Sequence, residues 1–258
     1  QRGLKDPIID LDLFRVPAFS TSVGTQLIVL IAIAGAYFFS VQYLQLVLGL
    51  SPLRAGMWLI PSTVAGMVGS MFAPVAARRA RPALVMSGGL LMAAAGFALL
   101  TQVRNGGGLP MLIAAFVILS IGISAAITIT TDLIVGVAPP ERAGAASAIS
   151  ETSSELGLAL GIAILGSVGT AVYRLDMADE IPAGIPSAAA DAARDTLGGA
   201  VAVAGRLPGQ LGKELLTVAQ EAFSHALQTT AITAVVIVTA LAIIVMVTLR
   251  QIPARSSD

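Results

Sequence analysis

The chain has 258 residues, of which 56% are hydrophobic and only 12% are charged, whereas an ordinary soluble domain carries about 25% charged residues. So few charges cannot solvate the surface of a protein of this size, and the composition therefore indicates a membrane protein. Lys and Arg number 15, as do Asp and Glu, so no basic excess is present to bind nucleic acid. The absence of cysteine and the presence of one histidine exclude disulfides, thiolate chemistry and multi-histidine metal sites. We expect no cofactor, no metal and no enzymatic activity.

Six apolar windows are long enough to cross a bilayer core of about 30 Å, which takes about 20 helical residues. They lie at residues 20–48, 55–77, 83–102, 109–136, 143–172 and 227–249. The fold class predicted is an all-α membrane protein, a bundle of six transmembrane helices. The chain then divides into a cytoplasmic lead-in (1–19), helices one to five (20–172), an outer helical loop (173–226), and the last helix with its cytoplasmic tail (227–258).

The distribution of Lys and Arg over the short connections predicts the orientation in the membrane. Three precede the first span, three lie between the second and third spans, and two follow the last, whereas the first and third loops carry one each. The fourth loop also carries one, Arg142, and does not discriminate between the two orientations. Both ends are therefore expected on the cytoplasmic side of the membrane, which we expect to be the plasma (bacterial inner) membrane. The lead-in has six charges within its first 16 residues and no apolar signal-peptide core, so we expect the chain to begin inside a longer polypeptide.

The outer loop contains two Ala-rich stretches, Ser187 to Ala204 and Leu211 to Gln228, with apolar residues at helical spacing. Residues 205–209 contain two glycines and a proline, which predict a break between them. We expect two amphipathic helices, the second continuing into the last span. A structural lid is favoured, with a binding module as the alternative.

The fifth span carries two carboxylates, Glu151 and Glu155. The i, i+4 spacing places both on one helix face, and a helix beginning at Ala143 puts Glu155 about 18 Å from its start. Carboxyl groups in a low-dielectric setting favour their neutral form, which suits groups that exchange protons. We predict a site for proton coupling and cation recognition. In the alternative, the helix begins later and Glu151 is only an N-terminal charge favoured by the helix dipole.

The first span places Phe38, Gln42 and Gln45 at i, i+4 and i+7, with Tyr43 beside them. A face that mixes an aromatic ring with two amides suits a cavity for flat, lipophilic cations. An aromatic belt at the membrane interface remains an equal alternative, especially for Tyr43.

Two further features of the spans have structural explanations. Asp132, near the cytoplasmic end of the fourth span, is a candidate gate through pairing with Arg142, although a solvated helix end is favoured. The Gly157-xxx-Gly161 pattern permits close approach of another helix, and we interpret it as packing.

Two longer stretches resemble a known family. Tyr43 to Pro61, containing Gly49-Leu50-Ser51-Pro52-Leu53-Arg54-Ala55-Gly56, resembles the first-to-second helix junction in the C-terminal half of the fourteen-span drug:proton antiporters of the major facilitator superfamily. Glu141 to Gly161 is similar to the penultimate helix of that family.

The resemblance implies the second six-helix bundle of a longer transporter whose N-terminal six-helix bundle is its partner. It implies roles for Glu151 and Glu155 in substrate recognition or protonation. Residues 77–82, with Arg78 and Arg79, resemble a degenerate copy of the cytoplasmic gating loop of the superfamily. The Asp usual there is absent, so only a basic inner-loop role is carried over.

These observations together predict proton-coupled efflux of lipophilic or cationic compounds across the plasma membrane. The alternatives are a lipid or metabolite exporter on the same scaffold and a membrane scaffold or sensor that does not transport.

Overall fold

A computed structural model describes residues 11–103 and 108–251, and over these residues the chain is helical without strands. Its long helices are α1 (Pro17–Gln42, continued by a π-helical turn, Tyr43–Val47), α2 (Pro52–Arg79), α3 (Pro82–Leu100), α4 (Gly108–Gly136), α5 (Ala143–Glu180) and α8 (Gly209–Leu249). Two short helices, α6 (Ser187–Asp195) and α7 (Leu197–Ala204), lie between α5 and α8. Among the described residues, six helices are long and apolar enough to cross a membrane. The predicted fold class is confirmed.

Proline sets the start of three of these helices. Pro17, Pro52 and Pro82 each occupy the first turn of a helix, where the missing N–H costs no hydrogen bond and the fixed φ suits the helix. At α2 the side chain of Ser51 also accepts a hydrogen bond from the backbone N–H of Arg54, which satisfies one of the free donors of the first turn.

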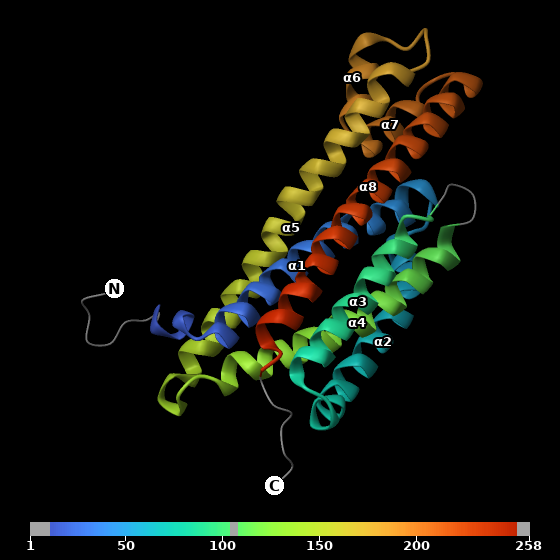
Figure 1. Cartoon of the computed structure of the whole chain (residues 1–258). Helices are drawn as coiled ribbons and strands as arrows, with labels where there is room; N and C mark the ends of the chain where they lie inside the picture. Colours follow the sequence, from blue (N-terminus) through green and yellow to red (C-terminus); the bar gives the residue numbers. More distant parts are fainter. Residues whose placement is uncertain (1–10, 104–107, 252–258) are drawn as a thin grey trace.

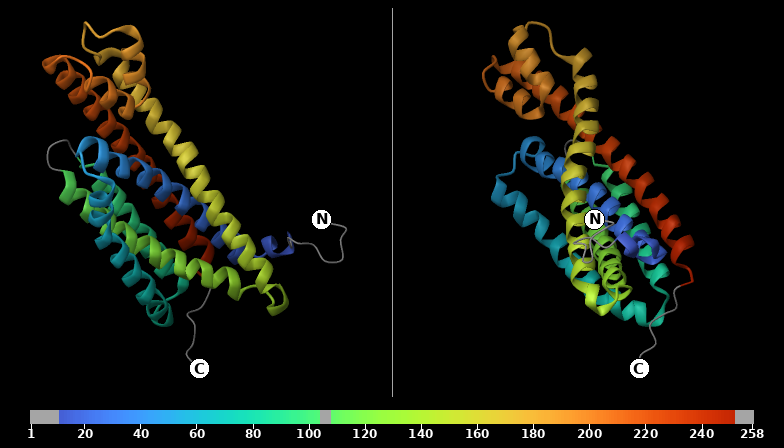
Figure 2. Two further views of the ribbon diagram at one scale, coloured as in Figure 1. Left: turned by 180° about the vertical axis from the view of Figure 1, so that it is seen from behind. Right: turned by 90° about the vertical axis from the view of Figure 1, so that its left-hand side faces the viewer.

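The helices form two groups joined by α8 (Figure 1). In one group α4 packs between α2 and α3, and in the other α1 packs along α5. Helix α8 contacts α3, α1 and α5 and so connects the groups. Both ends of the described chain lie at the end of the bundle opposite α6 and α7, as the two further views also show (Figure 2). Because the ends share one side, the number of membrane crossings is even, as predicted.

Small residues allow α1 and α5 to approach closely. A Cβ added to Gly157 would lie 2.8 Å from the backbone oxygen of Leu27, and one added to Gly161 would collide with the backbone oxygen of Ile31. The interpretation of this glycine pair as a packing surface is confirmed. The surface is filled from within the bundle, by α1.

The end of the bundle that carries α6 and α7 departs from the sequence prediction in two respects. Helix α5 continues to Glu180 instead of ending near residue 172. The predicted helix from 187 to 204 is broken at Thr196, whose extended backbone separates α6 from α7 and whose side chain caps α7 by accepting from Gly199 N–H. Helix α8 begins at Gly209 and continues without interruption into the last span, as expected.

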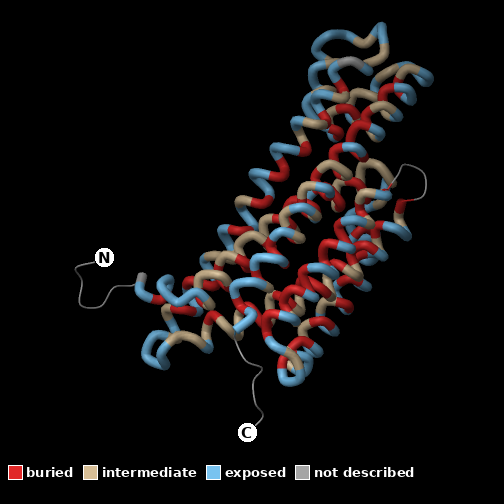
Figure 3. Tube along the Cα trace, in the orientation of Figure 1, coloured by how far each residue is buried: buried red, intermediate tan, exposed pale blue. Residues whose placement is uncertain are grey.

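Burial is uneven over the bundle (Figure 3). The core contains fully buried side chains of α1, α3 and α4, among them Phe39, Phe97 and Leu119. Helices α2, α5 and α8 also expose large apolar side chains. On α2 these include Met57, Ile60, Val64, Met67, Met71 and Phe72, on α5 Leu156, Ile162, Ile164 and Val168, and on α8 Ile232, Val236, Ile243, Ile244 and Val247. No other described helix covers these apolar faces, so they are available to lipid or to another helical bundle.

The basic residues used for the orientation are only partly described. Arg2, Lys5, Arg104 and Arg255 lie outside the described residues. The orientation therefore stays a prediction, although the connections on which it depends alternate between the two ends of the bundle as it requires (Figure 1).

Candidate functional site

Glu151 and Glu155 lie on an exposed face of α5. The helix begins at Ala143, so Glu151 is past its second turn, and the dipole of a helix favours negative charge only within the first turn. Both glutamates are exposed in the described bundle. Two carboxylates one turn apart thus stand on a membrane-spanning helix, on the side that the other described helices leave open.

A polar contact between α1 and α5 fixes the helix that carries these carboxylates. Ser150 Oγ donates a 2.9 Å hydrogen bond to Gln26 Oε1, and Gln26 Nε2 donates a 2.5 Å hydrogen bond to Ser154 Oγ. Each serine directly precedes a glutamate, so the contact sets the rotation of α5 about its own axis. Gln26 was missed at the level of the sequence, although a buried amide in an otherwise apolar span is itself a signal for such a contact.

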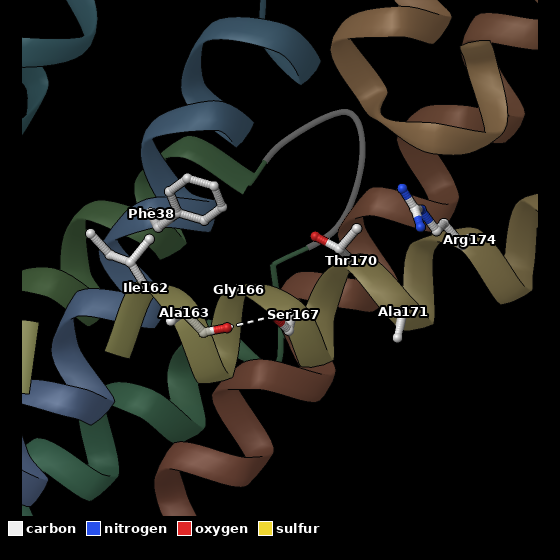
Figure 4. A pocket seen from close by; sticks show the side chains of 8 residues that line it. All are labelled: Phe38, Ile162, Ala163, Gly166, Ser167, Thr170, Ala171 and Arg174. Carbon is white, nitrogen blue, oxygen red and sulfur yellow. Dashed lines mark hydrogen bonds between the residues drawn. The ribbon is translucent and has the colours of Figure 1, made fainter. Parts of the chain in front are cut away.

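An open groove of about 410 Å³ lies further along the same helix (Figure 4). Phe38 of α1 and Ile162 stand at one end, Arg174 at the other, and Ser167 and Thr170 between them. The hydroxyl of Ser167 donates to the carbonyl of Ala163 on its own helix. The groove is therefore mostly apolar, with the Arg174 cation at the end opposite Phe38, and can accept a lipophilic compound.

The four residues predicted for the substrate cavity lie in different environments. Phe38 is 37% exposed and lines the groove. Gln42 lines a second, smaller pocket that also includes Phe38. Tyr43 is fully buried in the core, and Gln45 is half-buried in the π-helical turn. The wider π turn begins directly after Gln42, so the i, i+7 alignment expected for Gln45 on an α-helix does not apply.

The residues predicted for gating lie near the ends of the helices. Asp132 is half-buried in the last turn of α4, and Arg142 is exposed at the start of α5. Arg78 and Arg79 are exposed at the end of α2. The neighbouring Arg81 donates a 3.1 Å hydrogen bond to the carbonyl of Arg250 at the end of α8, which ties the basic loop to the C-terminus of the last helix, where a cation is favourable.

Within residues 11–103 and 108–251, no group of three His, Asp or Glu side chains could hold a metal ion. The site consists instead of carboxylates, hydroxyls and aromatic rings on helices that cross the membrane. Such a bundle is that of a multi-pass membrane protein. The chain belongs to the Major Facilitator Superfamily, whose family model matches residues 2–167.

Curated relatives of the chain are drug efflux and resistance proteins. It is 39% identical to the multidrug efflux pump LfrA of Mycolicibacterium smegmatis over 95% of this chain and 48% of that protein. It is 32% identical to the methyl viologen resistance protein SmvA of Salmonella typhimurium over 86% of this chain and 45% of that protein. The chain is 31% identical to the tetracenomycin C resistance and export protein of Streptomyces glaucescens, over 84% of this chain and 41% of that protein. The chain spans about half the length of these relatives.

A solved structure shows the same fold. The crystal structure of a bacterial homolog of the human lysosomal transporter Spinster, in an inward-facing and unoccupied conformation, superimposes with a TM-score of 0.70 at 19% sequence identity, covering 100% of this chain and 55% of the other. At this identity the similarity defines the architecture of the bundle alone.

Proposed function

We propose that the chain is the C-terminal six-helix bundle of a proton-coupled exporter of lipophilic or cationic compounds. The observation that carries the proposal is the pair Glu151 and Glu155, exposed on a membrane-spanning face of α5. A carboxylate in a low-dielectric cavity can accept a proton or pair with a cation, and competition between the two couples their movements.

The relatives support drugs as the substrate class. Three of them are named for multidrug efflux, methyl viologen resistance and tetracenomycin C export, and methyl viologen is a cation. The groove beside Phe38 supports the same class, because it combines apolar walls with a few hydroxyls.

The N-terminal six-helix bundle is the proposed partner. The exposed apolar faces of α2 and α5 offer surface for it or for lipid, and both glutamates lie on one of these helices. In this arrangement the carboxylates lie between two bundles that rock about a central cavity. The protein is expected in the plasma membrane, with both ends of this segment in the cytoplasm.

The test is transport by the full-length protein in inverted membrane vesicles driven by a pH gradient. Glu155→Gln keeps the size of the side chain and its hydrogen bonding but removes the charge. We expect it to lower proton-driven export of a dication such as methyl viologen at least about tenfold. Glu151 lies nearer than Glu155 to the start of α5, which is expected at the cytoplasmic side. Glu151→Gln should therefore weaken the export of cations and affect the export of neutral substrates less.

Glu214→Gln is the matched control, because Glu214 is exposed near the start of α8 and accepts a hydrogen bond from Gln210 in its own helix turn. It should export at the wild-type rate. Wild-type export by both Glu151→Gln and Glu155→Gln, at equal protein level, would refute the coupling role of the pair.

A further inference from the structure

A second pocket lies at the outer end of the bundle, beneath the junction of α6 and α7. It has a volume of about 80 Å³, and one water molecule needs about 10–15 Å³ of such space. It can therefore take a compact group the size of several waters. Its walls come from five helices, since α1, α5, α6, α7 and α8 all contribute side chains.

Four aromatic rings form the wall of this pocket. Phe38 contacts Phe39 edge to face with 5.4 Å between ring centroids, Phe39 lies 5.4 Å from Phe223, and Phe223 lies 6.4 Å from Tyr173. All but Phe38 are buried. The Tyr173 hydroxyl donates a 2.8 Å hydrogen bond to the carbonyl of Ala193, and this bond holds the Tyr173 ring in place. Aromatic rings that line a small space attract a cation where it lies over a ring face.

The pocket also contains a carboxylate and an amide. Asp195, the last residue of α6, lines it together with Gln42. Asp195 Oδ1 is 3.1 Å from the Arg174 guanidinium of α5, and both side chains are more than half exposed. The ion pair is thus open to water, where such pairs contribute little stability and exchange partners readily. Arg174 itself lines the neighbouring groove.

We propose that this pocket binds the quaternary ammonium or similarly compact cationic end of a substrate. The cation lies in the space that the four rings help to line, and Asp195 is its counter-ion. Arg174 competes with the substrate for the same carboxylate, so Asp195 exchanges the guanidinium for the bound cation.

The proposal rests on the proposed function, because it names the class of substrate, but it concerns a separate place in the molecule. Thr170, which lines the pocket, lies about 22 Å further along α5 than Glu155 at a rise of about 1.5 Å per residue. The pocket is therefore an outer site for cations, distinct from the pair of glutamates deeper in the membrane.

Direct titration of the full-length protein in lipid nanodiscs with phenyltrimethylammonium, without any pH gradient, tests the pocket. Asp195→Asn removes the counter-ion and leaves Arg174 unneutralised, so we expect the dissociation constant to rise about fivefold or more. Arg174→Gln removes the competitor, so the dissociation constant should fall. Asp191→Asn is the matched control, because Asp191 lies on the same helix and pairs with Arg194, and neither residue lines the pocket. It should bind as the wild type does.

The dissociation constant is expected to rise in Asp195→Asn and to fall in Arg174→Gln, and these opposite changes distinguish a cation site from a structural ion pair. If the pair only fastens α6 to α5, Asp195→Asn and Arg174→Gln remove the same contact and change binding in the same direction, which overturns the proposal. Equal affinity of Asp195→Asn and Asp191→Asn overturns it as well. Phe38→Leu, which removes an exposed ring without touching the ion pair, should weaken binding too, and an unchanged affinity counts against the aromatic wall.

Glu155→Gln keeps the two hypotheses apart. It should retain the component of binding that depends on Asp195 while losing proton-driven export. Wild-type export by both Glu151→Gln and Glu155→Gln overturns the coupling role and leaves the outer pocket untouched, whereas wild-type binding by Asp195→Asn overturns the pocket alone.

Discussion

Gln26 of α1 and Ser150 of α5 are joined across the helix interface by a 2.9 Å hydrogen bond from the serine hydroxyl to the amide oxygen. Both side chains are buried. Ser150 lies one residue before Glu151 and about two turns before Gly157, so polar contact, charge and close packing follow each other along one helix. The face of α5 that carries the glutamates is therefore oriented by a contact on the neighbouring face.

Replacement of Gln26 by Leu should loosen this orientation. The change removes the bonds to Ser150 and Ser154, and interhelical hydrogen bonds in membrane proteins contribute about 0.6–2 kcal/mol. Both serines keep a partner or can turn to their own helix, as Ser154 does by donating to the carbonyl of Ser150 at 3.1 Å. We expect a loss of about 1 kcal/mol, measured as a lower thermal unfolding temperature in detergent. Gln102→Leu, an exposed amide at the outer turn, should leave that temperature unchanged.

The glycine pair of α5 gives a second test. A methyl group at Gly161 would collide with the backbone oxygen of Ile31, so Gly161→Ala must push α1 and α5 apart and should destabilise the bundle by about 1–3 kcal/mol. Gly144, on the same helix, has no atom within 4 Å of the added Cβ. Gly144→Ala should therefore be neutral or slightly stabilising, because alanine favours the helix. Equal unfolding temperatures for the two variants would contradict the described contact.

The orientation in the membrane can be tested by labelling, because the chain has no cysteine of its own. Single cysteines at Ala80 and Pro140 should react with an impermeant maleimide only from the cytoplasm. A cysteine at Gly205, between α7 and α8, should react only from outside. Reaction of the Ala80 position in intact cells would reverse the orientation predicted here.

The π-helical turn after α1 depends on a side chain from another helix. Gln220 of α8 donates to the carbonyls of Leu46 and Val47, at 3.4 and 3.3 Å. Gln220→Leu leaves both acceptors without this donor, at a cost of about 1 kcal/mol. The amides of Leu48 and Leu50, which bond to Tyr43 and Leu44, should then exchange hydrogen faster. Gln210→Leu, whose partner is Glu214 on the same helix surface, should not change that exchange.

The number and position of the spans could be predicted because the bilayer imposes a length and the boundaries carry proline and serine. The break at Thr196 could not, since alanine periodicity continues across it. It depends on tertiary contacts, among them the bond from Tyr173 to Ala193 and the pair between Arg174 and Asp195. Local propensity contains no information on such contacts.

The site was predictable to the extent that it lies on one helix. The i, i+4 rule places Glu151 and Glu155 on one face, and both are exposed in the structure. Gln45 was placed by the same rule, but the π turn changes the residues per turn just before it. Phe223 and Asp195 come close to Phe38 only through the folding of the outer loop, so no spacing within α1 could have indicated them.

The lengths of α5 and α8 have a mechanical consequence. With 38 and 41 residues, the helices are about 57 and 61 Å long, roughly twice the thickness of the hydrocarbon core. Their outer halves are fastened to each other and to α6, in part through the contact between His225 and Asp176 at 2.6 Å. A tilt of about 10° displaces a helix tip about 30 Å away by about 5 Å. Tyr173 and Phe223 of the pocket lie about 10 and 21 Å short of the tips of α5 and α8, so the same tilt moves the pocket walls by a smaller distance than it moves the tips.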